Sequence, residues 1–299
     1  MIARRELLGG LLAAAVPRGP PRSPPPGEPR IIDAHVHVWT TDPKFPWAKA
    51  ATNPPTQDAT PEMLLALMKQ NGVARTVIVQ VSHYRWDHSY LIHALGRYPR
   101  AFVGVARVNP EDPAAPDALS RLVEQHQLRG LRLNCQADAA GDFIRGPLMP
   151  PLWQRCRDLG IVMALQTKAP RLPDMVPLIE RFPELTVAID HFADAPTDQP
   201  RLLDNLLALA RYPKVFVKLT HPWWISKQAY PYADGVEQAK RVYDRFGPRR
   251  MMWGSDWPGV EQKCGYAQAL ALARDQMKFL GAEDRRWVLG QTAERVWKL

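Results

Sequence analysis

The sequence predicts a closed barrel of eight parallel strands, each followed by a helix: an α/β fold of the (β/α)8, or TIM barrel, class. Eight short runs rich in β-branched residues alternate with longer amphipathic segments from residue 30 onward, and this alternation is typical of parallel βαβ units. Eight units in about 270 residues fit a closed barrel better than an open sheet. No GxGxxG or GxxxxGK[ST] motif follows any run, which counts against a nucleotide-binding open sheet.

The expected strands are short, as strands of a fully covered parallel sheet usually are. In order along the chain, they cover residues 31–38, 76–82, 102–108, 130–134, 161–166, 185–191, 215–220 and 251–256.

The expected helices show apolar residues at helical spacing, and several begin with a good cap or an early proline, as at Thr60-Pro61. They cover residues 61–71, 117–126, 148–159, 175–181, 202–210, 235–246 and 266–280.

Residues 1–29 are expected to lie outside the barrel, which would then span 30–299. Arg4 and Arg5 precede a weakly apolar stretch at 7–16 that ends in small residues. This order is that of an export signal, and the paired arginines resemble a twin-arginine signal. It predicts a periplasmic or exported protein; the alternative is a disordered extension on a cytoplasmic one. Residues 17–29 are rich in Pro and Arg and are expected to form an extended linker.

Composition argues against several classes of function. The formal charge is +9, but Lys and Arg are scattered without a dense run, which counts against nucleic-acid binding and suits a small anionic substrate better. No apolar run reaches the roughly 18 residues needed to span a bilayer, so no stable membrane anchor is expected. The three cysteines form no CxxC motif, so neither a zinc knuckle nor a redox pair is indicated.

Chemistry-bearing residues gather where the expected strands end. The first strand carries Asp33, His35 and His37 at alternating positions, so all three are expected to point to one side. The sixth ends at His191 and the eighth at Asp256. The carboxyl ends of barrel strands meet at one mouth, where active sites form. Because buried polar groups are costly unless they bind something, we interpret these residues as an active site.

Further residues near this mouth are expected to contact a substrate: Arg132, Gln80, His83, Lys218, Gln166 and Trp257. Arg132 is suited to bind a substrate carboxylate bidentately, with a surface salt bridge as the alternative. Lys218 is expected either to assist anion binding or to form an ion pair within the barrel. Trp257 follows a strand end and is expected at a hydrophobic rim, or packed between loops. His221 has the parity opposite to that of Thr220 and is interpreted as a loop residue without a role.

The motifs IIDAHVHVW (31–39), VIVQVSHY (77–84), RGLRLN (129–134), AIDHF (188–192), VKLT (217–220), MMWGSDWP (251–258) and QTAERVWKL (291–299) resemble those of the amidohydrolase superfamily. Within it, they are similar to the branch that includes pyrone-dicarboxylate lactonase and sugar-acid lactonases. The resemblance covers residues 31–299, and the DxHxH and GSDWP motifs are specific.

Members of this superfamily commonly bind divalent metals, and the resemblance places ligands at His35, His37 and Asp256. However, the fourth strand lacks the bridging Lys or Glu of the binuclear members, and the fifth ends at Gln166 where mononuclear members usually have His. Arg132 would also repel a cation at this mouth. The lactonases of the branch are described as working without metal. Two possibilities therefore stay open: no cofactor, or one divalent ion such as zinc.

The resulting hypothesis is hydrolysis of a lactone or related cyclic ester of a small carboxylic acid. Asp256 would act as general base on a water molecule, while His35, His37 and His191 would stabilise the oxyanion. Asp33 would orient the histidine pair. The alternatives are a metal-dependent non-oxidative decarboxylase of the same branch, and a barrel that binds a small acid without turning it over.

Overall fold

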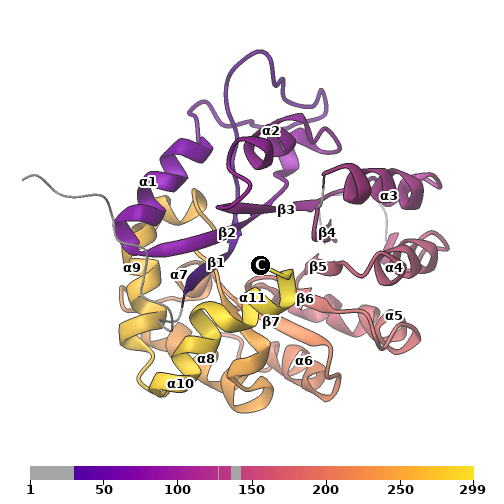
Figure 1. Ribbon diagram of the computed structural model, residues 1–299. Coiled ribbons are helices and arrows are strands. Elements are labelled where there is room, and N and C mark those ends of the chain that lie inside the picture. The colour runs from indigo at the N-terminus through magenta and orange to yellow at the C-terminus, as the bar shows by residue number, and fades with distance from the viewer. Residues whose placement is uncertain (1–29, 127, 136–142) are drawn as a thin grey trace, which may run out of the picture.

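Each strand of the single eight-stranded sheet pairs in parallel with the next along the chain (Figure 1). The structure is a computed structural model and describes residues 30–126, 128–135 and 143–299. The predicted export signal and linker, residues 1–29, lie outside the described residues. The strands are β1 (Ile31–Val36), β2 (Val73–Val79), β3 (Phe102–Ala106), β4 (Gly130–Asn134), β5 (Val162–Gln166), β6 (Val187–Ile189), β7 (Val215–Leu219) and β8 (Met251–Trp253).

The sheet closes between its first strand and the segment that follows its last. The backbone NH of His37 donates to the carbonyl of Trp257 at 2.7 Å, and the NH of Asp256 donates to the carbonyl of His35 at 2.8 Å. Gly254 permits the approach, because a Cβ atom there would lie 2.9 Å from the Cβ atom of His35. The predicted (β/α)8 barrel is confirmed.

Helices surround the barrel (Figure 1). They are α1 (Pro61–Asn71), α2 (Ser89–Arg97), α3 (Ala115–His126), α4 (Met149–Asp158), α5 (Val176–Arg181), α6 (Leu203–Ala208), α7 (Pro222–Ile225), α8 (Ala233–Phe246), α9 (Gly265–Ala271), α10 (Ala282–Arg286) and α11 (Thr292–Trp297). α1 begins as predicted: the hydroxyl of Thr60 accepts from the NH of Met63, and Pro61 occupies the first turn. None of the helices in the described ranges is long and apolar enough to cross a membrane.

Apolar periodicity located most of the helices that cover the barrel, including the six-residue α5 and α6. The predicted segments left out α2, α7, α10 and α11. The predicted helix at 266–280 is interrupted, since α9 gives way to a π-helical turn, Leu272–Gln276. The second strand begins at Val73 rather than at residue 76.

α11 lies across one end of the barrel (Figure 1). Its Trp297 is fully buried and packs among interior residues such as Val162 and Met252. Gly130 at the start of β4 is fitted to this ring, because a Cβ atom there would lie 2.8 Å from it. The amino ends of the strands are therefore plugged by an indole, and the polar residues collect at the opposite, carboxyl end.

Candidate active site

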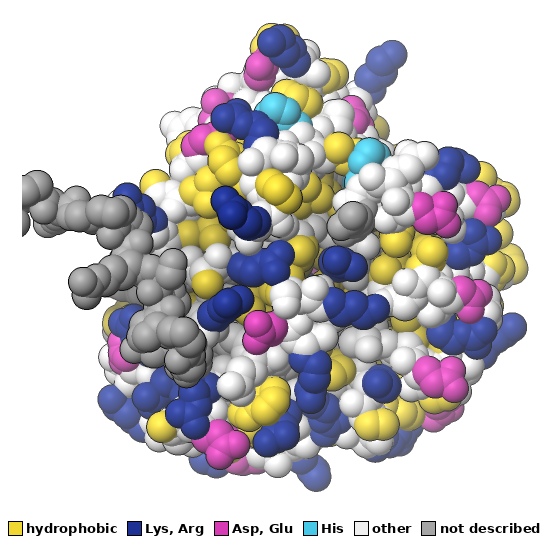
Figure 2. Space-filling model, in the orientation of Figure 1, with side chains coloured by type: hydrophobic (Ala, Val, Ile, Leu, Met, Phe, Trp, Pro, Cys, Tyr) yellow, Lys and Arg dark blue, Asp and Glu magenta, His cyan; other side chains and the backbone are white. Residues whose placement is uncertain are grey.

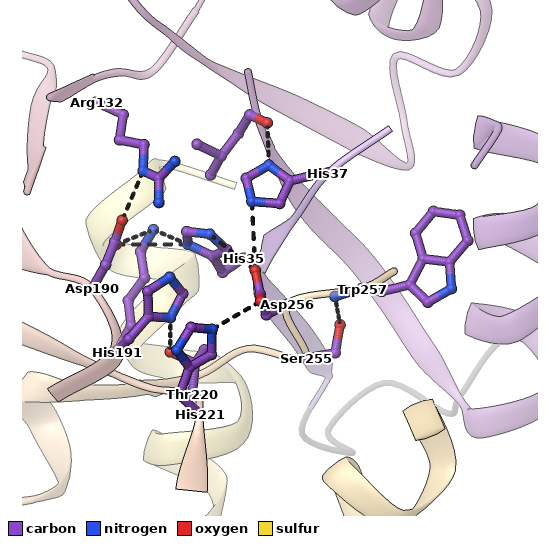
Figure 3. A network of polar contacts seen from close by, with 12 residues as sticks. His35, His37, Arg132, Asp190, His191, Thr220, His221, Ser255, Asp256 and Trp257 are labelled. Carbon is purple, nitrogen blue, oxygen red and sulfur yellow. Dashed lines mark hydrogen bonds and ion pairs between the residues drawn. The ribbon is translucent and has the colours of Figure 1, made fainter. Parts of the chain in front are cut away.

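Carboxylate and imidazole groups cluster at the carboxyl ends of β1, β6 and β8 (Figure 3). β1 supplies His35 and leads into His37, the segment after β6 supplies His191, and the segment after β8 supplies Asp256. The four residues predicted to be catalytic thus lie together, although they come from parts of the chain more than 200 residues apart.

Asp256 is the centre of the cluster. Its Oδ1 atom lies 3.5 Å from Nε2 of His35 and 3.5 Å from Nε2 of His37. Its Oδ2 atom lies 2.8 Å from Nε2 of His221. Burial opposes ionisation of this carboxyl group, but the charge and hydrogen bond of His221 outweigh it and hold the pKa of Asp256 well below its usual value. The group is therefore a carboxylate at neutral pH.

His221 was interpreted from the sequence as a loop residue without a role. It does lie in the loop between β7 and α7, but its side chain reaches into the cluster. Its Nε2 atom contacts Asp256, and its Nδ1 atom lies 3.1 Å from Oδ1 of Asp194. Burial lowers the pKa of His221, but the two carboxylates outweigh burial and raise it to about 9. Each ring nitrogen faces a carboxylate oxygen, and only an imidazolium can donate to both.

Strand alternation failed for His221 because the backbone leaves the extended conformation there. Its φ is 69°, in the left-handed region. β7 ends at Leu219, and His221 follows one residue later, after Thr220. Asp194 and Asp256 also have positive φ, at 47° and 55°. Non-glycine residues in this region are uncommon and collect at functional sites. The one signal in the sequence was position, since His221 follows a strand end at the mouth.

His191 is buried between its neighbours. Its ring stacks on that of His221 with centroids 3.5 Å apart and an angle of 3°, and its Nδ1 atom lies 2.5 Å from the hydroxyl oxygen of Thr220. Burial, and then the charge of His221, hold the pKa of His191 well below its usual value. His191 is therefore a neutral imidazole beside a charged one.

Beneath the cluster, Asp190 joins two cations. Its Oδ2 atom accepts from Nε of Arg132 at 3.0 Å, and its Oδ1 atom lies 3.0 Å from Nζ of Lys218. All three side chains are almost fully buried. Lys218, whose two predicted roles were anion binding and a barrel ion pair, forms the ion pair and is fully buried; its contact with a substrate anion stays a prediction. Arg132 likewise pairs with Asp190, and the surface salt bridge considered for it is wrong.

Lys218 also determines which nitrogen of His35 carries the proton. Its Nζ atom lies 2.9 Å from Nδ1 of His35. Burial lowers the pKa of Lys218, but Asp190 opposes that change, and an ammonium group can only donate. Oδ1 of Asp190 also faces Nδ1 of His35 but lies farther from it, at 3.6 Å, so Nδ1 accepts from the ammonium group. Burial, followed by the charge of Lys218, lowers the pKa of His35 to about 3, so the ring is neutral and its single proton lies on Nε2, which faces Asp256.

His37 has the opposite arrangement. Its Nδ1 atom lies 2.8 Å from the carbonyl oxygen of Val79, and a carbonyl oxygen can only accept. Nδ1 of His37 therefore donates, and Nε2 faces Oδ1 of Asp256. The two histidines of the HxH motif thus differ at Nδ1: that of His35 accepts from an ammonium group, and that of His37 donates to a carbonyl.

Strict alternation predicted that Asp33 points to the same side as His35 and His37. The structure places Asp33 on a different side. The pairing of β1 with β2 is irregular between Asp33 and Val36, and such an irregularity re-aims the side chains that follow it. Asp33 is fully buried and accepts from the backbone NH and the hydroxyl of Ser255, at 2.9 and 2.6 Å. It also accepts from the NH of His35 at 3.1 Å. Asp33 therefore ties β1 to the segment after β8 that carries Asp256.

The predicted substrate contacts at β2 and β5 are placed differently from one another. Gln80 is buried, and its side-chain amide donates to the carbonyl of Asp87 at 2.5 Å. This hydrogen bond holds the loop that follows β2. The amide nitrogen is therefore not available to a substrate, contrary to the prediction. His83 is half-buried, and burial, followed by the charge of His37, lowers its pKa. Gln166 is half-buried at the end of β5. His83 and Gln166 keep a substrate contact as a prediction.

Trp257 was predicted to line the substrate, and its placement contradicts this. The ring is 2% exposed and packs in the apolar layer between strands and helices, and Figure 3 shows it directed away from the imidazole cluster. The rim is formed differently: Trp223 is buried, whereas Trp224 is 40% exposed, with its ring 6.3 Å from that of His221.

The metal ligands that the resemblance implied were His35, His37 and Asp256. Within the described ranges, the group whose ligand atoms all lie within 4.8 Å of one another consists of His35, His191 and Asp256. By distance, the three possible metal ligands are therefore His35, His191 and Asp256, with His191 in the place of His37. Nε2 of His35 is buried without a hydrogen-bond partner.

The pKa of about 9 for His221 predicts a basic limit to activity. Because the folded pKa is raised above the usual 6.5, the ionic contacts to Asp194 and Asp256 are fully present below pH 6.5 and are lost as pH rises through about 9. We expect kcat/KM to fall over that range, and the His221→Gln variant to lack this decline. The exposed His93 on α2 provides the matched control, His93→Gln. A decline that persists unchanged in His221→Gln would contradict the assignment.

A closed (β/α)8 barrel with a carboxylate among imidazoles at the carboxyl ends of its strands defines a barrel enzyme of the hydrolase class. The Amidohydrolase family model matches residues 32–299. The chain therefore belongs to the amidohydrolase family, and it is a hydrolase.

Individual relatives are similar over most of the chain. An L-fucono-1,5-lactonase of Burkholderia ambifaria is 29% identical over 280 residues, which are 90% of this chain and 95% of the relative. A 4-sulfomuconolactone hydrolase of Rhizobium radiobacter is 30% identical over 230 residues, 76% of this chain and 75% of the relative. A crystal structure of a probable 2-pyrone-4,6-dicarboxylic acid hydrolase from Acinetobacter baumannii, with citric acid bound, superposes with a TM-score of 0.78 at 19% identity. That match covers 90% of this chain and 100% of the neighbour, and it shows the shared fold.

Proposed function

We propose that this protein hydrolyses a lactone of a small carboxylic acid without a metal ion. The observation that carries the proposal is the setting of Oδ1 of Asp256, which lies 3.5 Å from the protonated Nε2 atom of His35 and 3.5 Å from Nε2 of His37. Ester hydrolysis needs a base for water and a donor for the oxyanion. Both are pre-formed here.

Asp256 is the proposed general base. It is ionised, because His221 holds its pKa low, and its Oδ1 atom faces the mouth between two imidazoles. A water molecule on Oδ1 attacks the lactone carbonyl carbon, and the carbonyl oxygen becomes an oxyanion that accepts from Nε2 of His35. A second neutral imidazole, His191, lies with its ring centroid 4.6 Å from that of His35.

The proton taken from water must return to the leaving oxygen when the ring opens. Nε2 of His37 can accept it from Oδ1 of Asp256 and deliver it to the alkoxide. The acyl–oxygen bond breaks, the water oxygen stays on the new carboxyl group, and the alkoxide becomes a hydroxyl group. One water molecule is consumed, and the product is a hydroxy acid.

We assign the substrate's carboxylate, where it has one, to Arg132. Asp190 accepts from Nε of this guanidinium, so its two terminal nitrogens are the donors left for an anion. Figure 3 shows the guanidinium beside the imidazole cluster. A guanidinium fork suits a carboxylate. Two of the relatives, an L-fucono-1,5-lactonase and a 4-sulfomuconolactone hydrolase, support a lactone as the substrate class.

The residues do not fit a divalent ion as they stand, although three ligand atoms are close together. A histidine that binds metal normally donates its other ring NH to a carboxylate or a carbonyl. Here that position of His35 is occupied by the Lys218 ammonium, which donates instead, so Nε2 carries a proton rather than a lone pair. A zinc ion in this site would require proton loss next to a buried cation.

The test is hydrolysis of a panel of γ- and δ-lactones, with and without a free carboxylate. Hydrolysis is measured as the release of protons. The enzyme is first dialysed against a strong chelator, and metal loss is confirmed by elemental analysis. We expect turnover to survive metal removal and to be faster for carboxylate-bearing lactones. An Arg132→Lys variant should lose that preference through a higher KM.

Each other outcome points elsewhere. Activity that disappears on chelation and returns with zinc or manganese would overturn the metal-free mechanism. Carbon dioxide release from aromatic acids without lactone turnover would indicate a decarboxylase, and binding without turnover of any lactone would indicate a non-catalytic barrel.

We also propose that the protein is exported, on the basis of Arg4 and Arg5 before the apolar stretch. Cell fractionation of the full chain, with the mature N-terminus determined, tests this. A cytoplasmic protein with an intact N-terminus would refute it.

A further inference from the structure

We propose that a cavity at the amino-terminal end of the barrel, on the side opposite the active site, binds a small polyanion carrying two or more phosphate or carboxylate groups. The cavity has a volume of about 680 Å³ and lies beside α11, at the amino ends of β5 to β8. That volume is within the range of about 300–1,000 Å³ for small-molecule sites.

The lining of this cavity is strongly cationic. Six Lys and Arg residues line it against a single acid, Glu184. The cations are Arg157, Lys214, Arg249, Arg250, Arg295 and Lys298. Figure 2 shows Lys and Arg side chains gathered over the centre of the face on which α11 lies, with few acidic side chains among them. Such a concentration of one sign in a concave site raises the local concentration of anions.

Four of these charges have no carboxylate partner among the described residues. Arg157 pairs with Asp158 and Arg249 with Glu283. Arg250 donates instead to the carbonyls of Ala210 and Tyr212. Arg295 donates to the carbonyl of Arg249, and Lys298 donates to the carbonyl of Gly160. The fourth cation is Lys214.

Carbonyl partners satisfy hydrogen bonds but leave the positive charge uncompensated. They also fix where the charged groups of Arg250, Arg295 and Lys298 lie. Like charges that are held together repel one another, and an anion bound between them removes that repulsion. Arginine forks favour oxyanions such as phosphate and carboxylate.

The same end of the barrel has further unsatisfied cations. Nε of Arg75 and Nε of Arg129 are buried without a hydrogen-bond partner. They line an adjoining cavity of about 360 Å³ at the amino ends of β2 to β4. Burial, followed by the charges of Arg30 and Arg129, lowers the pKa of Arg75. The excess of positive charge therefore extends across this face, over both the 360 Å³ and the 680 Å³ cavities.

The test uses the full chain and two probes, pyrophosphate and citrate, titrated by calorimetry at fixed ionic strength. Lys214 is exposed, so Lys214→Glu should fold normally and weaken binding about tenfold or more, because it reverses a charge at the site. Glu184→Gln should strengthen binding. Lys69→Glu on α1 makes the same charge change away from the cavity and should leave binding unchanged. Preference for pyrophosphate or for citrate identifies which oxyanion the site takes.

Several results would overturn the proposal. Binding of neither probe refutes it, and so does binding that Lys214→Glu and Lys69→Glu weaken equally, because that is a nonspecific effect of net charge. Binding that neither variant changes would place the anion in the active site. Association with duplex DNA or anionic vesicles, without binding of either probe, would indicate a polyanionic surface as partner instead. Because lactone hydrolysis is not part of the measurement, these outcomes are independent of the proposed function.

Discussion

Replacing Asp256 with asparagine is expected to lower kcat by about 10²–10⁴-fold, the typical contribution of a general base. The amide keeps the size of the side chain but cannot take a proton from water. Lactone hydrolysis by Asp256→Asn is compared with that of the wild type at pH 7, and thermal unfolding is measured on both proteins. The fold is expected to persist, because Asp33 ties β1 to Ser255 independently of Asp256.

Asp204→Asn is the matched control, since its carboxylate pairs with Arg241 on the protein surface. It should leave kcat unchanged. If Asp256→Asn turned over lactones at a rate close to that of the control, Asp256 would not be the base. His37, whose Nε2 atom lies 3.5 Å from Oδ1 of Asp256, would become the first candidate.

Replacing Asp190 with asparagine is expected to remove about 3–5 kcal/mol from the free energy of unfolding, the usual cost of breaking a buried ion pair from one side. The substitution leaves Lys218 and Arg132 as two buried cations with no anion between them. Urea denaturation measures the loss, with Asp204→Asn again as the control. That exposed pair is expected to contribute less than about 1 kcal/mol.

A double-mutant cycle with Lys218→Met separates the pair from the rest of the site. Removing both partners should cost less than the sum of the single losses, because neither leaves the other unpaired. Equal stability of Asp190→Asn and the control would mean that Asp190 does not hold the two cations in the folded protein. Additive losses would mean that Lys218 and Asp190 act independently.

The sequence by itself determined the architecture and the chemical character of the site. Alternation of β-branched runs with helical periods predicts the barrel, because those two periods follow from local backbone geometry. Position at strand ends was enough to select His35, His37, His191 and Asp256, since the strands of a parallel barrel place their carboxyl ends at one mouth. α2, α7, α10 and α11 were not among the predicted helices.

The tertiary structure alone decided how those residues divide the work. His221 joins the site through a left-handed backbone conformation, which strand alternation does not describe, and an irregularity in β1 turns Asp33 toward Ser255. Trp257, which looked like a rim residue, is directed into the apolar layer.

The assignment of protons depended most on tertiary structure. Lys218 contacts His35 across 183 positions of sequence, and the carbonyl of Val79 faces His37 from the neighbouring strand. These two partners make Nδ1 of one histidine an acceptor and Nδ1 of the other a donor, although both stand in one HxH motif. A tautomer is fixed by the atom opposite the ring nitrogen, and folding brings that atom from a distant part of the chain; residue type and spacing carry no information about it.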